Sequence, residues 1–111
     1  MAHLHDAREP TSAQIAALPG LTLLEFGASW CGICAHTRPQ LHSELLEHPD
    51  IQHVRIEDGR GQPLGRSFGV KLWPTLVLLQ HGKEIARAVR PPNRQAIARL
   101  LEQPPSATPG H

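Results

Sequence analysis

The chain has 111 residues, a length that suits one domain with one modest hydrophobic core. Hydrophobic residues make up 40% and charged residues 19% of it, which is the balance of a globular protein. Eleven basic and ten acidic residues give a formal net charge of +1, and neither sign forms a long run. The sequence therefore lacks the charged surface typical of proteins that bind nucleic acid or anionic membranes.

The longest apolar stretches, residues 21–26 and 75–80, are far too short to cross a bilayer. Residues 1–10 contain acids and histidines and have no apolar segment, so they are not typical of a signal peptide. We therefore expect a protein without membrane contact that resides in the cytoplasm. Disulfides in that compartment are usually transient and catalytic rather than structural.

The first part of the chain alternates between helical and strand patterns. A short helix, for which Thr11 or Ser12 is a suitable N-cap, comes first. Residues 21–28 form a continuous apolar run with one carboxylate, Glu25, which indicates a buried strand. Residues 31–50 then predict a long helix.

The second part of the chain begins with residues 51–58, whose apolar positions alternate well enough for a second strand. Residues 59–70 are rich in glycine and predict a loop with a short helix. Residues 74–90 predict a β-hairpin with a glycine in its turn, and the last pattern is a helix that Asn93 can cap.

This order predicts an α/β fold with a mixed central sheet and helices on both of its faces, because a long helix joins the first two strands and a tight turn joins the last two. The domain is expected to span residues 10–102. Residues 1–9 form a separate N-terminal segment with room for a short strand. Residues 103–111 are rich in proline and are expected to be disordered.

Cys31 and Cys34, the only cysteines, lie between the first predicted strand and the start of the long helix. Free backbone N–H groups and the helix dipole stabilise an anion at that place, so the pKa of Cys31 should be lowered. Cys34 lies one helical turn further in and should be more sheltered. Cys31 is therefore the expected nucleophile, and Cys34 the thiol that resolves a mixed disulfide.

Other uses of a CxxC pair fit the sequence less well. Attachment of c-type haem requires a histidine directly after the second cysteine, where this chain has Ala35. A zinc site needs four ligands, and His36 and His42 do not have the spacing of a Cys2His2 site. A structural disulfide across so short a loop would remove little entropy from the unfolded chain. A CxxC without any chemistry stays open on these grounds alone.

Several motifs together resemble those of the thioredoxin family. They are the stretch LLEFGASWCGIC at residues 23–34, a proline eight residues after the first cysteine, GVKLWPT at residues 69–75, and the HGK turn at residues 81–83. The resemblance covers roughly residues 10–102 and implies a thioredoxin fold.

The resemblance also implies a substrate-binding surface around the two cysteines. Pro74 matches the family's cis-proline, which presents its backbone to an incoming peptide; the alternative is an ordinary proline at the start of a strand. Trp30 matches an aromatic wall beside the dithiol. The substrate-binding residues expected on this basis all lie near the cysteine pair in the family's fold: Trp30, Gly32, Ile33, Trp73, Pro74, Thr75 and Arg90.

Glu25 matches the position of a buried aspartate beneath the second cysteine in thioredoxins. Burial should raise the pKa of this carboxyl, and the resemblance implies that it takes the proton from Cys34. Arg55, on the neighbouring strand, is its expected ion-pair partner. The alternative is a structural Glu25 that faces a sheet edge or only pairs with a cation.

The chain departs from the family's pattern at several positions of the expected site. Ile33 replaces the proline of the usual CGPC motif, which should shift the redox potential. Gly27 stands in place of an aromatic residue and should leave space beside the cysteines. Arg90 stands in place of a glycine in the groove and adds bulk and charge.

The function that the resemblance implies is thiol–disulfide exchange, most of all reduction of protein disulfides by the Cys31/Cys34 dithiol. The implied partners are disulfide-containing proteins and a reductase as electron donor, with thioredoxin reductase expected. A monomer without organic cofactor or metal is expected. The alternative is a partner-binding module with this fold, or a client-specific redox adaptor with little general reductase activity.

Overall fold

The computed structural model of the protein describes residues 9–103. Its elements follow the order expected from the sequence: α1 (Ser12–Ala16), β1 (Leu21–Gly27), α2 (Gly32–Leu46), β2 (Gln52–Glu57), α3 (Pro63–Ser67), β3 (Thr75–Gln80), β4 (Lys83–Val89) and α4 (Arg94–Leu101). The expected N-terminal segment with room for a short strand (residues 1–9) and the expected disordered tail (residues 103–111) lie outside the described part of the chain, except for Glu9 and Gln103.

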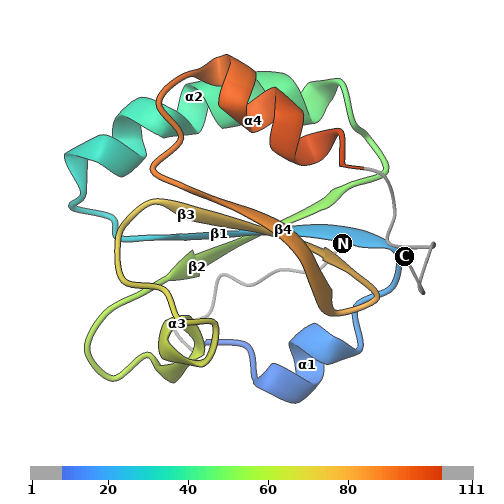
Figure 1. The fold of residues 1–111 in the computed structure, drawn as a ribbon. Helices are drawn as coiled ribbons and strands as arrows, with labels where there is room; N and C mark the ends of the chain where they lie inside the picture. Colours follow the sequence, from blue (N-terminus) through green and yellow to red (C-terminus); the bar gives the residue numbers. More distant parts are fainter. Residues whose placement is uncertain (1–8, 104–111) are drawn as a thin grey trace.

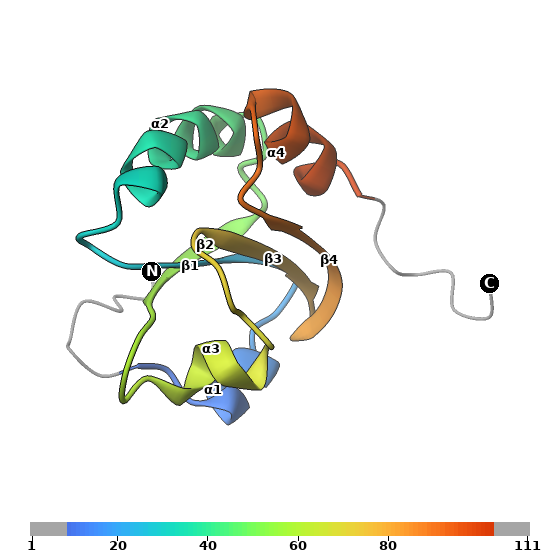
Figure 2. The ribbon, with the colours of Figure 1, turned by 60° about the vertical axis from the view of Figure 1, so that its left-hand side comes forward.

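The strands form one mixed sheet in the order β2-β1-β3-β4. β1 runs parallel to β2 and antiparallel to β3, and β3 and β4 form the antiparallel hairpin. Helices α2 and α4 cover one face of this sheet, and α1 and α3 cover the other (Figures 1 and 2). The predicted α/β architecture is confirmed.

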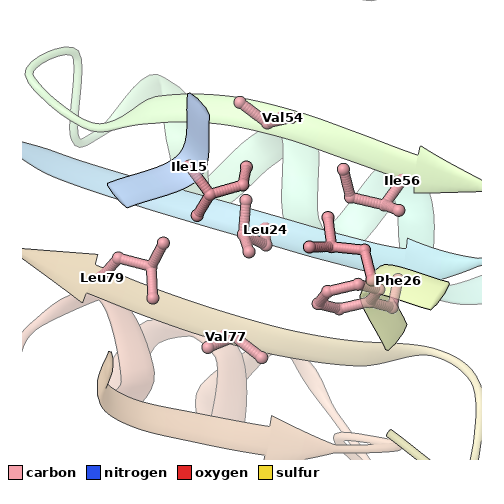
Figure 3. Close-up of a cluster of buried hydrophobic side chains, with 8 residues drawn as sticks. Ile15, Leu24, Phe26, Val54, Ile56, Val77 and Leu79 are labelled. Carbon is pink, nitrogen blue, oxygen red and sulfur yellow. The ribbon is translucent and has the colours of Figure 1, made fainter. Parts of the chain in front are cut away.

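The central strand β1 is buried on both faces, and its side chains point alternately to one face of the sheet and to the other. Leu24 and Phe26 point toward α1 and α3, where they pack with Ile15 and with side chains of β2 and β3 (Figure 3). Leu23 points to the opposite face and packs with Leu41 of α2. By the same alternation, Glu25 lies on the face that α2 covers.

The turns and caps that the sequence predicted hold these elements in place. Thr11 and Gln14 form a capping box at the start of α1, and the Ala96 N–H donates to Oδ1 of Asn93 at 2.9 Å at the start of α4. The hairpin turn uses positive φ at both His81 (50°) and Gly82 (82°). These local signals explain why the predicted starts of α1 and α4 and the predicted hairpin agree with the structure.

Candidate active site

Cys31 occupies the N-cap position of α2, directly after the turn that follows β1. Its Sγ accepts a hydrogen bond from the backbone N–H of Cys34 at 3.2 Å, the role that a serine or aspartate oxygen usually has at a helix start. A negative charge on Cys31 therefore meets a backbone donor and the positive end of the α2 dipole.

The two thiols are free, and their surroundings differ. Cys31 is 9% exposed, whereas Cys34 is fully buried. Burial would raise the pKa of Cys31, but hydrogen bonds from Cys34 and Ile33 and the charge of Arg90 lower it below its ordinary value. Burial, together with the hydrogen bond to Cys31, raises the pKa of Cys34 to about 11. Cys31 is thus slightly exposed and ionises more readily than an ordinary cysteine, whereas Cys34 is fully buried and keeps its proton.

Gly27 is the last residue of β1, and it allows the strand to approach α2 closely. A Cβ at this position would lie 2.8 Å from Sγ of Cys34, which is closer than real contacts allow. The expectation that Gly27 leaves space beside the cysteines is therefore wrong, because the Cys34 sulfur itself fills that space. The missing side chain lets the thiol rest against the strand.

Glu25 lies next to this contact. Glu25 precedes Gly27 by two residues on the same face of β1, roughly 6–7 Å along the strand. On the facing helix α2, Arg38 follows Cys34 by one turn, so Arg38 is opposite Glu25 as Cys34 is opposite Gly27. Nε of Arg38 lies 3.5 Å from Oε2 of Glu25. Nε2 of His53, on β2, lies within hydrogen-bonding distance of Oε1 at 2.8 Å. The carboxylate, 3% exposed, therefore has one basic partner for each oxygen.

The expected pairing of Glu25 with Arg55 is corrected by this geometry. Arg55 is the register neighbour of Glu25, but its side chain is exposed, and the close contacts of the carboxylate are to His53 and Arg38. Burial alone would raise the pKa of Glu25, yet the hydrogen bond and charge of His53 and the charges of Arg38 and Arg55 lower it. Glu25 is therefore ionised at neutral pH, not protonated as burial alone would favour.

Sequence reasoning gave no role to His53 or Arg38. The helical spacing of four between Cys34 and Arg38 is a signal that could have found Arg38. His53 precedes Arg55 by two residues and shares its strand face, so the alternation of β2 made both residues candidates.

Aromatic residues form the exposed rim of the site. Trp30 is 76% exposed, and its ring meets that of Trp73 edge to face, with centroids 5.3 Å apart. Trp73 packs on the cluster of Ala28, Cys31 and Cys34. Its Nε1–H donates to Oδ2 of Asp58 at 2.7 Å, a contact that fixes the indole and that sequence reasoning missed. Trp30 is thus a surface residue beside the dithiol and not part of the core.

The other expected substrate-binding residues differ in how they are presented. Ile33 is exposed, and the space around the missing side chain of Gly32 is open. The Trp73–Pro74 bond is cis, as the resemblance implied. Thr75 is buried, and its hydroxyl donates to the carbonyl of Leu72 at 2.6 Å, so its side chain faces inward.

Arg90 adopts a left-handed backbone conformation, φ 48°, at the end of β4. Its backbone N–H donates to the carbonyl of Pro74 and its Nε–H to the carbonyl of Trp73, both at 2.8 Å. These bonds hold the side chain over the Trp73–Pro74 segment, and its charge favours the thiolate of Cys31. The structure therefore brings a fixed cation to the edge of the cysteine site.

Within residues 9–103, His, Cys, Asp and Glu do not gather in groups of three or more that could hold a metal ion. No helix in that part of the chain is long and apolar enough to cross a membrane.

Two neighbouring thiols at a helix start, one ionisable and accessible and one sheltered, can exchange a disulfide with another molecule and then form their own. With a four-stranded mixed sheet and helices on both faces, this arrangement defines a thiol–disulfide oxidoreductase.

Comparisons with known proteins support the assignment to this class. A family model described as Thioredoxin matches residues 5–103. The structure of reduced thioredoxin 2 from Pseudomonas aeruginosa shares 42% identity with the chain and a TM-score of 0.77, covering 89% of this chain and 92% of that one. A thioredoxin from Chlamydia muridarum is 31% identical over 84 residues, which are 76% of this chain and 82% of its own length. The chain therefore belongs to the thioredoxin family, whose members reduce protein disulfides through such a dithiol.

Proposed function

We propose that the chain reduces disulfide bonds in client proteins, with Cys31 as the attacking thiolate and Cys34 as the resolving thiol. The observation that carries this assignment is the asymmetry of the pair. The Cys34 backbone N–H donates to Cys31 Sγ, while the Cys34 side chain is fully buried. A client sulfur can therefore reach Cys31 only, and Cys34 can then attack from within.

The exchange has two steps. The Cys31 thiolate attacks one client sulfur, a Cys31–client disulfide forms, and the other client sulfur leaves as a thiolate that takes a proton from solvent. Cys34 then loses its proton and attacks Cys31 Sγ, so that the Cys31–Cys34 disulfide forms and the second client sulfur leaves. Two electrons have moved from the dithiol to the client. A reductase, of the thioredoxin reductase class, returns two electrons and two protons.

Glu25 is the proposed base of the second step. The pKa of Cys34, at about 11, leaves little thiolate at neutral pH, so proton removal needs help. The carboxylate of Glu25 is ionised and lies on the strand face that contacts Cys34 through Gly27. Arg38 reaches from α2 to Glu25 on β1, and its charge also favours the thiolate form of Cys34.

The proposed docking surface surrounds Cys31. Exposed Trp30 and Ile33 offer apolar contact, the space at Gly32 is open, and the Trp73 ring packs against that of Trp30. The cis Trp73–Pro74 segment is the proposed place for an extended client segment. Pro74 itself is buried and its carbonyl accepts from the Arg90 N–H, so the client would lie over this segment, with Thr75 supporting it from within. Arg90 adds a cation that favours acidic residues near the client disulfide.

We further propose that residues 10–102 are the folded unit, that it acts as a monomer, and that it works in the cytoplasm. Bacterial thioredoxins are among the relatives. A dithiol that is kept reduced by a reductase suits a reducing compartment.

Reduction of insulin tests the proposal. Turbidity from precipitated insulin chains should appear with NADPH and thioredoxin reductase, and should be lost in Cys31→Ser. Cys34→Ser should accumulate a covalent complex with the client that dithiothreitol releases, and the double variant Cys31→Ser/Cys34→Ser should form none. A double variant that binds the client as tightly as the parent, together with a parent that reduces nothing, would establish a binding module instead.

A further inference from the structure

His53 lies between the buried Glu25 carboxylate and solvent. β2 is an edge strand, and the His53 side chain is 24% exposed, whereas that of Glu25 is 3% exposed. An ionised carboxylate can only accept hydrogen bonds, so Nε2 of His53 carries the hydrogen and donates to Oε1 of Glu25 at 2.8 Å.

The contact with Arg38 is of a different kind. Nε of Arg38 lies 3.5 Å from Oε2 of Glu25. The Arg38 Nε is buried and has no hydrogen-bond partner within residues 9–103. Arg38 therefore contributes a fixed charge, while His53 also orients the carboxylate through a short hydrogen bond. Of these two side-chain types, a guanidinium stays protonated in proteins, whereas an imidazole can take up or release a proton.

The charged and titratable groups that face His53 come from three elements. Glu25 on β1 accepts its hydrogen bond, Arg38 on α2 pairs with the same carboxylate, and Arg55 is on its own strand. His42 on α2 meets the His53 ring edge to face, with centroids 5.8 Å apart. The one anion of this group is Glu25, so a positive charge on His53 acts first on that carboxylate.

We propose that His53 is a positioning residue for the resolving step: it orients Glu25 and sets its strength as a base, so that proton removal from Cys34 depends on the charge of a histidine. This inference rests on the proposed role of Glu25. A neutral His53 holds the carboxylate by a hydrogen bond alone. A protonated His53 binds it as a full ion pair, which makes Glu25 a weaker base and slows the step.

The resolving step is chemically the same whether His53 is neutral or protonated. Glu25 takes the proton of the Cys34 thiol, the Cys34 sulfur bonds to Cys31 Sγ, and the Cys31–client bond breaks with its electron pair leaving on the client sulfur. The proton passes from Glu25 to solvent once the Cys31–Cys34 disulfide has formed.

The test is stopped-flow reaction with one equivalent of 5,5′-dithiobis(2-nitrobenzoate). The first release of thionitrobenzoate reports attack by Cys31, and the second reports attack by Cys34 on the mixed disulfide. In the parent, the pH profile of the second rate should rise through an inflection of roughly three- to ten-fold. His53→Gln, which keeps a hydrogen-bond donor but no titrating charge, should lose this inflection and keep the first rate.

Two further variants separate the possible outcomes. His42→Gln, a matched histidine that touches His53 but not Glu25, should keep the inflection. If Glu25→Gln slows the second phase while His53→Gln keeps the inflection, the inference about His53 is overturned and the role of Glu25 stands. If Glu25→Gln leaves the second phase unchanged, the base assignment and this inference both fail.

A second measurement applies should His53→Gln fail to fold. The 13C shift of the Glu25 carboxyl carbon in the parent should change together with the shifts of the His53 ring as the pH is varied. A Glu25 signal that ignores the His53 titration would overturn the inference.

Discussion

At the scale of single residues, Glu25 shows how neighbours can outweigh burial. An isolated carboxylate buried in an apolar strand would protonate, because desolvation penalises its charge. Here a hydrogen bond from His53 and the charges of Arg38 and Arg55 more than offset that cost, and the pKa of Glu25 is lowered. The residue is thus kept as an anion on the face of β1 that α2 covers.

The lowered pKa of Glu25 also makes this residue a source of stability that depends on pH. Its folded pKa lies below the unfolded value of about 4.3, so its contribution is present above that value and is lost as pH falls through the folded pKa. Glu25→Gln should therefore lower the free energy of unfolding by about 1–3 kcal/mol at neutral pH, because His53 and Arg38 lose their anion. In acid, near pH 3, the difference should shrink. Urea denaturation at both pH values measures it.

Glu84 provides a matched control for that measurement. Its pKa is also lowered, by the hydrogen bond from Arg87, but the pair is on the surface, with side chains 34% and 30% exposed. Solvent screening makes such a pair worth under about 1 kcal/mol, so Glu84→Gln should change stability much less. Equal effects of the two substitutions would contradict the account of Glu25.

At the scale of elements, the site depends on how closely α2 approaches β1. Three successive positions on one face of β1 meet three turns of α2: Gly27 meets Cys34, Glu25 meets Arg38, and Leu23 packs in the same cluster as Leu41. The contact at Gly27 lies directly at the sulfur of Cys34.

Gly27→Ala tests this approach. The added Cβ would lie 2.8 Å from the fully buried Cys34 sulfur, so the Cys34 side chain, α2 or β1 must shift. We expect a loss of about 1–3 kcal/mol in the free energy of unfolding, the cost of overpacking, and a slower second phase in the thionitrobenzoate assay. A Gly27→Ala protein as stable as the parent would contradict the close approach.

Gly32→Ala is the control for that substitution. Gly32 is in the first turn of α2, and a Cβ there would meet nothing within 4 Å. Replacing a glycine by alanine in a helix should keep or raise stability, by up to about 1 kcal/mol. The two glycines are five residues apart in the chain and should therefore respond with opposite signs.

At the scale of the whole molecule, local patterns predicted most of the fold. The apolar run of β1, the capping residues Thr11 and Asn93, and the glycine of the hairpin turn all act within a few residues, so the sequence alone reveals them. The CxxC pair is also a local pattern, because helical spacing by itself brings Cys34 next to Cys31.

What the sequence did not reveal depends on how distant elements meet. Arg55 was the expected partner of Glu25 because it is the register neighbour, yet the hydrogen bond comes diagonally from His53 and the ion pair from α2. The Trp73–Asp58 hydrogen bond likewise joins two loops. Such contacts follow from side-chain direction and helix position, which periodicity does not specify.

The central claim is that Cys31 is the slightly exposed thiol that ionises more readily than an ordinary cysteine, and that Cys34 is the fully buried thiol that keeps its proton. Its most direct test is the rate of alkylation of each thiol by iodoacetamide as a function of pH, followed by peptide mass spectrometry on the reduced protein. Cys31 should titrate below the ordinary cysteine pKa of about 8.5. Cys34, with a pKa raised to about 11, should stay nearly unreactive across the neutral range. Equal rates for both thiols at every pH, or faster alkylation of Cys34, would contradict the account.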